Sequence, residues 1–256
     1  AMLAFHRERG SKLTIALTPV EDPTAYGLVE MDSAGHIRRF MEKPRIDEVT
    51  TNLINAGTYI IEPELFRYVP PKQHYMFERG LFPVVLQTHD PMFGYPSRAY
   101  WTDIGTPPAY LDVHHDILVG KVRYHFHGQE IGNRVWLVGD ADIHPSAQVI
   151  GPVVIGPGVK IGAGAQVIGP TVIGAGCVIG AQARIEGAVL WEQNQIADSV
   201  VLRSCVIGHR NQIGMGSHIG DGSIISDACV IEAENRLDRG IRVWPETHLK
   251  EKSISF

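Results

Sequence analysis

The sequence contains few cysteines and no long run of one residue class. Its three cysteines are odd in number and far apart, at Cys177, Cys205 and Cys229. They fit a reducing cytoplasm and do not fit a disulfide framework. No Cys-x-x-Cys pair suggests a zinc site. No run of Lys and Arg reaches five residues and the formal net charge is −5, so nothing favours a nucleic-acid partner.

Hydrophobic stretches that could cross a membrane are also absent from the sequence. No apolar run approaches the ~18 residues that a transmembrane helix needs. Residues 1–9 contain no long apolar region of the kind that signal peptides carry. We therefore expect a cytoplasmic protein with no membrane partner.

Glycine is abundant but unevenly distributed. The chain has 27 glycines in 256 residues, and most of them follow residue 130. Hydrophobic residues make up 44% and charged residues 20%, an ordinary composition that is able to form a core. The change in glycine content indicates two architectures, an α/β region followed by an all-β region.

The second half carries an aliphatic residue at every sixth position. The series runs Ile143, Val149, Ile155, Ile161, Val167, Ile173, Ile179 and Ile185, slips by one residue at Leu190 and again at Ile207, and continues to Ile231. A period of six is neither helical nor that of a single amphipathic strand. It suits a triangular solenoid in which each hexad supplies one short strand and one corner. The pattern resembles the hexapeptide-repeat family, whose fold is a left-handed parallel β-helix.

These observations predict the domain boundaries. We expect residues 1–120 to form one domain, residues 121–140 a linker, residues 141–235 the β-helix and residues 236–256 a tail. About five coils should lie between residues 143 and 233. The tail should leave the repeat, because Trp244-Pro245 cannot continue a strand that needs a ladder hydrogen bond. It should pack back over the end of the β-helix and cover an exposed sheet edge.

The first half has the alternation of strands and helices that is typical of an α/β domain. We expect strands at residues 13–19, 27–31, 37–40 and 55–61, separated by turn residues. We expect helices that begin at Pro63, from Phe77 to Thr88, and from Pro107 to Val119. The last helix should have Thr106 as its N-cap and Pro107 at its first position.

Four short motifs in this half resemble the sugar-1-phosphate nucleotidyltransferase family. They are Tyr26-Gly27, Glu42-Lys43-Pro44, Asn55-Ala56-Gly57 and Trp101-Thr102-Asp103-Ile104-Gly105-Thr106-Pro107. Within the family the chain is most similar to mannose-1-phosphate guanylyltransferases, and hexapeptide repeats often follow the catalytic domain. The resemblance implies a partial Rossmann-like domain, with an NTP and a sugar 1-phosphate as substrates and Mg²⁺ as cofactor.

The resemblance also implies which residues contact the sugar. It assigns substrate binding to Gly27, Glu42, Lys43, Asn55, Ala56, Gly57 and Trp101. Glu42 has the chemistry to accept hydrogen bonds from sugar hydroxyls, and Asn55 offers both a donor and an acceptor. Gly27 would let a ligand approach the backbone closely. The alternatives are a turn glycine, a solvated ion pair of Glu42 with Lys43, a strand cap at Asn55 and a core role for Trp101.

The catalytic residues are expected to be Lys43 and Asp103. Lys43 would meet the charge of the sugar phosphate. Asp103 would bind the metal, since Mg²⁺ prefers one or two carboxylates together with phosphate oxygens. The alternative for Asp103 is to cap the helix that follows. We expect Gly27, Glu42, Lys43, Asn55 and Asp103 to converge on one concave face.

The glycine-rich phosphate loop with which the family begins does not occur in this sequence. We therefore expect a chain without the N-terminal part of the catalytic domain, whether artificially shortened, partly observed or a natural fragment, and inactive by itself. Two other functions stay open: a regulatory or sugar-sensing homologue without chemistry, and a hexapeptide acyltransferase that uses His144, His209 or His218. The flat sides of the β-helix favour a homo-oligomer over a monomer.

Overall fold

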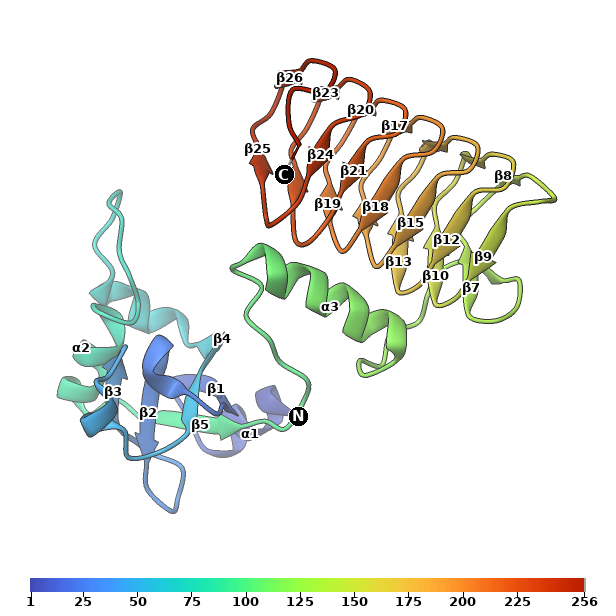
Figure 1. The fold of residues 1–256 in the computed structure, drawn as a ribbon. Helices are drawn as coiled ribbons and strands as arrows, with labels where there is room; N and C mark the ends of the chain where they lie inside the picture. The colour runs from blue at the N-terminus through green and yellow to red at the C-terminus, as the bar shows by residue number, and fades with distance from the viewer. Residues whose placement is uncertain (256) are drawn as a thin grey trace. The chain divides into compact units, whose positions relative to one another are not determined.

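The structure is a computed structural model that describes residues 1–255 of the chain. These residues form two compact units, residues 1–101 and residues 102–255. Figure 1 shows the α/β fold of the first unit and the stacked coils of the second. Among the described residues, no helix is both long and apolar enough to cross a membrane. Each unit is described by itself below.

The first unit is built on a mixed sheet of five strands in the order β3-β2-β4-β1-β5. Its elements are α1 (Met2–Glu8), β1 (Leu13–Pro19), β2 (Gly27–Met31), β3 (Ile37–Glu42), β4 (Leu53–Ile61), α2 (Leu81–Thr88) and β5 (Met92–Pro96), with short 3-10 helices at Pro23–Ala25, Ile46–Glu48 and Pro63–Tyr68. Strands β1 and β5 are parallel, and the other neighbouring pairs are antiparallel. The four predicted strands are therefore confirmed, and β5 is an additional one.

The core of this unit lies between the sheet and α2. Leu13, Ile15 and Leu17 alternate along β1 and are fully buried against Phe82 and Val85 of α2. On the other side of β1, Thr14 bonds to His6 of α1, with 2.7 Å between Oγ1 and Nδ1. Helix α2 begins at Leu81 rather than at the predicted Phe77, because Gly80 and not an earlier residue is its N-cap. The segment that begins at Pro63 is a 3-10 helix.

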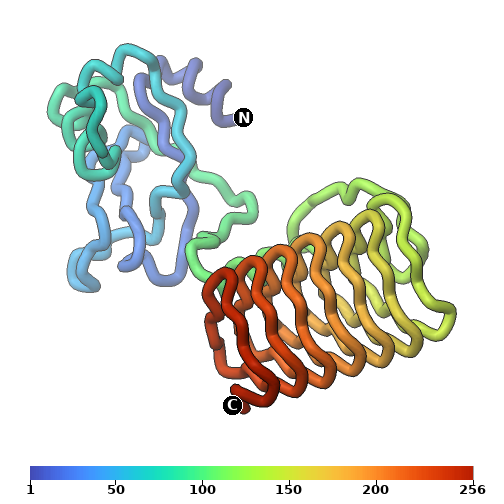
Figure 2. Tube along the Cα trace, turned by 90° about the horizontal axis from the view of Figure 1, so that it is seen from above, coloured from blue at the N-terminus to red at the C-terminus, as the bar shows by residue number. Residues whose placement is uncertain are grey.

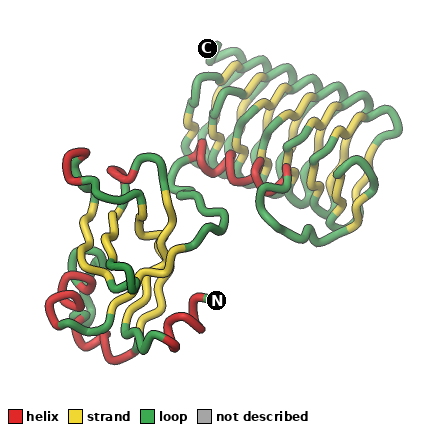
Figure 3. Tube along the Cα trace, turned by 90° about the horizontal axis from the view of Figure 1, so that it is seen from below, coloured by secondary structure: helices red, strands yellow, loops and turns green. Residues whose placement is uncertain are grey.

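The second unit begins before the predicted linker. Helix α3 (Pro107–Val119) has Thr106 as its N-cap, and the Thr106 hydroxyl accepts from the backbone N–H of Ala109 at 3.4 Å, as predicted. Leu111 of α3 packs against Val189 and Val206 of the β-helix. Figure 3 shows that the helix runs beside several successive coils, across the direction of their strands. The contacts of residues 102–120 place them in the second unit, whereas the predicted first domain extends to residue 120.

Three parallel sheets form the sides of the β-helix. The first sheet contains β7 (Val135–Leu137), β10 (Val153–Ile155), β13 (Thr171–Ile173), β16 (Val189–Leu190), β19 (Val206–Ile207), β22 (Ile224–Ile225) and β25 (Arg242–Val243), with β6 (Gln129–Glu130) antiparallel at its edge. The second contains β8 (Ala141–Ile143), β11 (Val159–Ile161), β14 (Val178–Ile179), β17 (Gln195–Ile196), β20 (Gln212–Ile213), β23 (Val230–Ile231) and β26 (His248–Leu249). The third contains β9 (Gln148–Ile150), β12 (Gln166–Ile168), β15 (Arg184–Glu186), β18 (Val201–Arg203), β21 (His218–Ile219) and β24 (Arg236–Leu237).

The aliphatic positions of the six-residue period stack in columns inside the coils. Ile155, Ile161, Val167, Ile173 and Ile179 are all at most 2% exposed, which confirms their predicted burial. Both slips of the period fall in the corner between the third sheet and the first, where the corner has one residue fewer. The register of the stacked strands is kept across each slip, as the pairing of Leu190 with Ile207 shows.

The β-helix is longer than the sequence predicted at both ends. Six coils are complete, since the third sheet has six strands, and β25 and β26 continue beyond them. Figure 2 shows the coils stacked one on the next. Strands β6 and β7 lie within the predicted linker 121–140, and β24 to β26 lie within the predicted tail from Arg236, so the strands of the stacked sheets continue into both segments. Pro245 does not end the repeat because it lies in a corner, where its missing N–H is not needed by a ladder.

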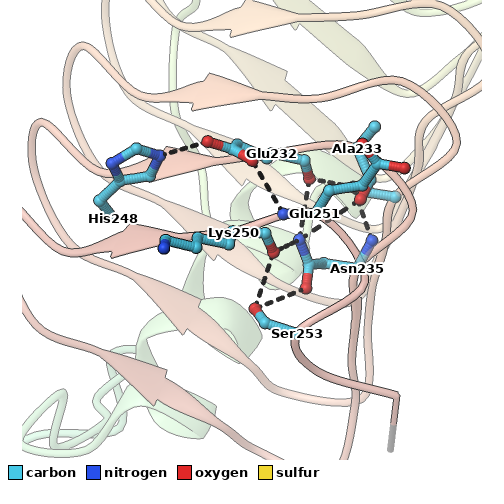
Figure 4. Close-up of polar contacts among 8 residues, drawn as sticks. Glu232, Ala233, Asn235, His248, Lys250, Glu251 and Ser253 are labelled. Atoms are coloured by element: carbon cyan, nitrogen blue, oxygen red, sulfur yellow. Dashed lines mark hydrogen bonds and ion pairs between the residues drawn. The ribbon is translucent and has the colours of Figure 1, made fainter.

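The tail does not pack back over the end of the β-helix as predicted, because its residues continue the coils. Ile254 and Ser255 run beside β24, and the Ile254 carbonyl accepts from the backbone N–H of Arg236 at 2.8 Å. Asn235, which is 1% exposed, donates to the carbonyls of Glu232 and Lys250. Figure 4 shows this network. A buried amide that satisfies several backbone groups holds the final turn in place.

Candidate functional site

Most of the predicted sugar-binding residues come together in the first unit, at neighbouring positions of three strands. Gly27, the first residue of β2, pairs with Glu42, the last residue of β3. The adjacent pair of Leu28 with Ile54 brings β4 alongside, so that Asn55 lies next to Gly27 in the following row. Residues that are far apart in sequence thus meet at one end of the sheet.

Gly27 is a buried strand residue and not a turn glycine. A Cβ at this position would lie 2.7 Å from the Phe40 ring and 3.0 Å from Oε2 of Glu42. The first distance is shorter than packed atoms tolerate, and the second would require the Glu42 carboxylate to shift by a few tenths of an ångström. The absence of a side chain therefore lets the Glu42 carboxylate lie over the backbone of β2, which places that carboxylate in the site.

Lys43 follows directly after β3 and is exposed. Its backbone N–H donates to the Tyr26 carbonyl at 2.9 Å, which ties it to the residue before Gly27. Its φ angle is +50°, in the left-handed region that a non-glycine residue rarely adopts. This left-handed backbone conformation at Lys43 ends strand β3 at Glu42.

Trp101 joins two of the motifs to each other. Its Nε1–H donates to the Ala56 carbonyl at 3.0 Å, and its ring meets the ring of Tyr26 edge-on at 5.6 Å between centroids. Gly57 has a φ angle of +72° and lies where the pairing of β1 with β4 is irregular. A cavity of about 250 Å³ opens here, and its lining includes Thr18, Thr58 and Trp101.

The Asn55 side chain is held by two partners. Its Oδ1 accepts from the backbone N–H of Gly57 at 2.9 Å, and its Nδ2 donates to the hydroxyl of Tyr59 at 2.8 Å. The Tyr59 hydroxyl in turn donates to Oε1 of Glu78 at 3.1 Å. Burial, and then the nearby charges of Glu78 and Glu42, raise the pKa of Tyr59 to about 12, although the bond from Asn55 opposes the shift.

Tyr59 and Glu78 were not predicted to belong to the site. The signal for Tyr59 was weak, since an aromatic residue in a strand is more often a core residue. Glu78 lies just before α2, and no sequence spacing connects it with Asn55. Its carboxylate reaches the site only because the chain returns to the sheet after β4.

Asp103 lies in the second unit, so its predicted convergence with Glu42 and Asn55 stays a prediction. The side chain is exposed, and its Oδ1 accepts from the backbone N–H of Gly105 at 3.0 Å. The cap of α3 is Thr106 and not Asp103, which removes the capping alternative. One accessible carboxylate fits a Mg²⁺ ion that takes its other ligands from phosphate and water. Within residues 1–255 no three metal-ligating side chains of His, Cys, Asp or Glu converge.

The three histidines considered for acyl transfer have different environments. His144 is exposed and bonds to Oγ of Ser146 at 2.8 Å, and His209 accepts from the backbone N–H of Glu192 at 3.3 Å. Both lie in corners of the coils. His218 lies in strand β21 and not in a corner, with its Nε2 at 3.6 Å from Oδ1 of Asp238.

Comparisons with known proteins divide the chain in the same way as its motifs. Residues 1–119 match the family model described as nucleotidyl transferase. Residues 133–237 match the model described as the left-handed β-helix domain of the EIF2B epsilon subunit. The handedness predicted from the hexapeptide repeats agrees with this match.

Curated relatives cover different parts of the chain. A mannose-1-phosphate guanylyltransferase of Mycobacterium tuberculosis is 34% identical over 64% of this chain and 45% of its own length. A UTP–glucose-1-phosphate uridylyltransferase of Synechocystis is 32% identical over 61% of this chain and 46% of its own length. A mannose-1-phosphate guanyltransferase of Schizosaccharomyces pombe is 31% identical over 99% of this chain and 64% of its own length.

In the first two of these alignments the chain spans about half the length of the relative. The family matches and the fold nevertheless agree on the nature of both parts. Residues 1–119 match the nucleotidyl transferase family, and the hexapeptide repeats that follow form a left-handed parallel β-helix domain.

Proposed function

We propose that this chain supplies the sugar-phosphate-binding part of a nucleotidyltransferase that makes GDP-mannose from GTP and mannose 1-phosphate. The observation that carries the proposal is that Glu42 and Asn55 lie on the two strands that flank Gly27, in one row at one end of the sheet. A carboxylate and an amide at adjacent positions suit the hydroxyl groups of a sugar. The guanylyltransferase names of several relatives favour mannose and guanine.

In this reaction a phosphate oxygen of the sugar 1-phosphate attacks the α-phosphorus of the NTP. A new P–O bond forms, the bond to the β-phosphate breaks, and pyrophosphate leaves with the electron pair. No covalent intermediate with the protein is needed, so catalysis rests on positioning and electrostatics. Glu42 and Asn55 would hold the sugar, and Lys43 would offset the negative charge of its phosphate.

Asp103 would be the protein ligand of Mg²⁺, which when bound offsets negative charge on the phosphates. The exposed carboxylate of Asp103 supports this role. A cytoplasmic location is proposed because Cys177, Cys205 and Cys229 are buried free thiols. A homo-oligomer that assembles through the β-helix is also proposed, and the exposed side chains of Met215 and Trp244 on its corners support it.

The proposal is tested by titrating the ¹⁵N-labelled chain with mannose 1-phosphate and following its amide resonances. Those of Gly27, Glu42 and Asn55 should shift together. Glu42→Ala should weaken binding by at least about tenfold, because a hydrogen bond to a charged group contributes about 1.5–3 kcal/mol. Glu8→Ala, which removes an exposed carboxylate from α1, is the matched control and should bind normally. Equal binding by the two variants would remove the sugar site from this position.

The same purified chain should release no pyrophosphate from GTP and mannose 1-phosphate above a blank. The reason is that a phosphate loop does not occur in residues 1–256. The loss of even one preorganised contact to the transition state costs about 10²–10³ in rate. Measurable pyrophosphate release would show that the chain is active as it stands.

A further inference from the structure

The orientation of the Asn55 amide follows from a backbone group that cannot change its role. The Gly57 N–H is a donor and lies 2.9 Å from the Asn55 side chain. Only the amide oxygen can accept from it, because the NH₂ group would bring two donors together. The amide nitrogen must therefore face the other partner, the hydroxyl of Tyr59.

This orientation decides the direction of the next hydrogen bond. Since Asn55 donates to the Tyr59 oxygen, the hydroxyl proton of Tyr59 is available for another acceptor. That acceptor is the Glu78 carboxylate, at 3.1 Å. Each group in the series has one role that is compatible with its neighbours, so the three side chains act as a directed relay from Gly57 to Glu78.

The relay is held in place by aromatic packing. The Tyr59 ring meets the rings of Phe82 and Phe77 at angles of 69° and 62°, with centroids 5.3 Å and 6.4 Å away. Phe82 is fully buried. A phenol packed between two rings has little freedom to turn, so its oxygen stays where Asn55 needs it.

We propose that Tyr59 and Glu78 are positioning residues that aim the second N–H of Asn55 at a hydroxyl oxygen of the bound sugar. This inference rests on the proposed function. One hydrogen of Nδ2 is used by Tyr59, and the other remains for a ligand. Asn55 then presents a donor while Glu42 presents acceptors, so that the site fits two sugar hydroxyls with opposite hydrogen-bonding roles.

The relay is tested first without any ligand. In the ¹⁵N-labelled chain, Tyr59→Phe should move both side-chain amide proton resonances of Asn55 toward those of a free asparagine. Tyr68→Phe is the matched control, since it removes a phenol hydroxyl that bonds to Asp90 in the same unit, and it should leave them in place. Unmoved Asn55 resonances in Tyr59→Phe would overturn the relay.

Glu78 is tested by two substitutions that differ in hydrogen bonding. Glu78→Gln keeps an oxygen that accepts from Tyr59, and should retain the Asn55 resonances. Glu78→Leu removes the acceptor and should move them. A purely structural role would not make this distinction between an amide and a hydrocarbon of similar size, and identical spectra for the two variants would contradict the proposal.

The second arm adds mannose 1-phosphate and measures its dissociation constant. Tyr59→Phe and Glu78→Leu should each weaken binding by about three- to tenfold, the range expected for one hydrogen bond, while Glu78→Gln binds as the unaltered chain does. Normal binding by all variants would overturn the positioning role. If the unaltered chain binds no sugar phosphate although the resonances shift as described, the proposed function fails and the relay stands.

Discussion

The β-helix repeats one set of contacts, whereas the α/β unit makes each of its contacts once. In the β-helix, Ile155 stacks on Ile173, and Leu190 stacks on Ile207 in the same column. In the α/β unit a single ring, that of Phe82, packs against both Phe40 and Tyr59. The loss of one side chain from a column leaves the same contacts in place in the other coils. The loss of Phe82 removes contacts that occur nowhere else in the α/β unit. The comparison teaches that stability is distributed in one region and concentrated in the other.

The largest effect is expected from Phe82→Ala in the α/β unit. This change removes a fully buried ring and should lower the free energy of unfolding of that unit by about 3–5 kcal/mol. Tyr59 loses one of the two aromatic rings that pack against it, so the Asn55 amide should also become mobile. Urea unfolding followed by tryptophan fluorescence and by amide resonances of each unit measures both effects. A loss under about 1 kcal/mol would show that the core is not concentrated there.

A smaller and more local effect is expected from Leu202→Ala in the β-helix. Leu202 is fully buried in β18, so its truncation should cost about 2–5 kcal/mol. Hydrogen exchange should increase mainly in the adjacent strands β15 and β21, because repeat proteins are stabilised by contacts between nearest neighbours. Val201→Ala, at the outward-facing neighbour in the same strand, is the control and should cost less. Uniform loss of protection along all coils would contradict the distributed picture.

The same difference explains how much of the fold could be predicted from the sequence. The six-residue period is imposed on every coil, so the buried positions of the β-helix were read directly from it. The ends were missed where the local sequence does not look like a strand, as at Trp244-Pro245. The structure places Pro245 in a corner, and Pro157 holds the corresponding corner of an earlier coil. In the α/β unit, β5 was missed because Met92–Pro96 is short and contains both glycine and proline.

The candidate site was predictable only where motifs mark it. Glu42 ends β3 and Asn55 lies near the start of β4, each in a short motif, and their positions on either side of Gly27 follow from the order of the strands. Glu78 carries no such signal, because its contact with Tyr59 depends on the path of the chain between β4 and α2. A contact that occurs once, between residues far apart in the chain, produces no repeating pattern in the sequence from which it could be predicted. The polar relay behind Asn55 therefore required the three-dimensional structure.

The smallest expected effect separates the two regions by pH. Burial, together with the carboxylates of Glu78 and Glu42, raises the pKa of Tyr59 from 10.0 to about 12. Between these values the unfolded chain has lost a proton that the folded chain still holds, so the free energy of unfolding of the α/β unit should fall as pH rises. The stabilisation is complete below pH 10 and is lost as the pH passes about 12. The β-helix has no part in this titration of Tyr59.

Denaturant unfolding of the α/β unit at several pH values from 9 to 12 tests this expectation. One proton accounts for at most about 1.4 kcal/mol per pH unit, and solvent access to the half-buried ring should reduce that figure. Other tyrosines and the lysines titrate in the same range, so the informative quantity is the difference between the unaltered chain and Tyr59→Phe. The variant should show a shallower decline, while Tyr68→Phe keeps the original slope. Parallel curves for all three proteins would mean that Tyr59 ionises as an ordinary exposed phenol, and that the carboxylates around it do not act on its hydroxyl.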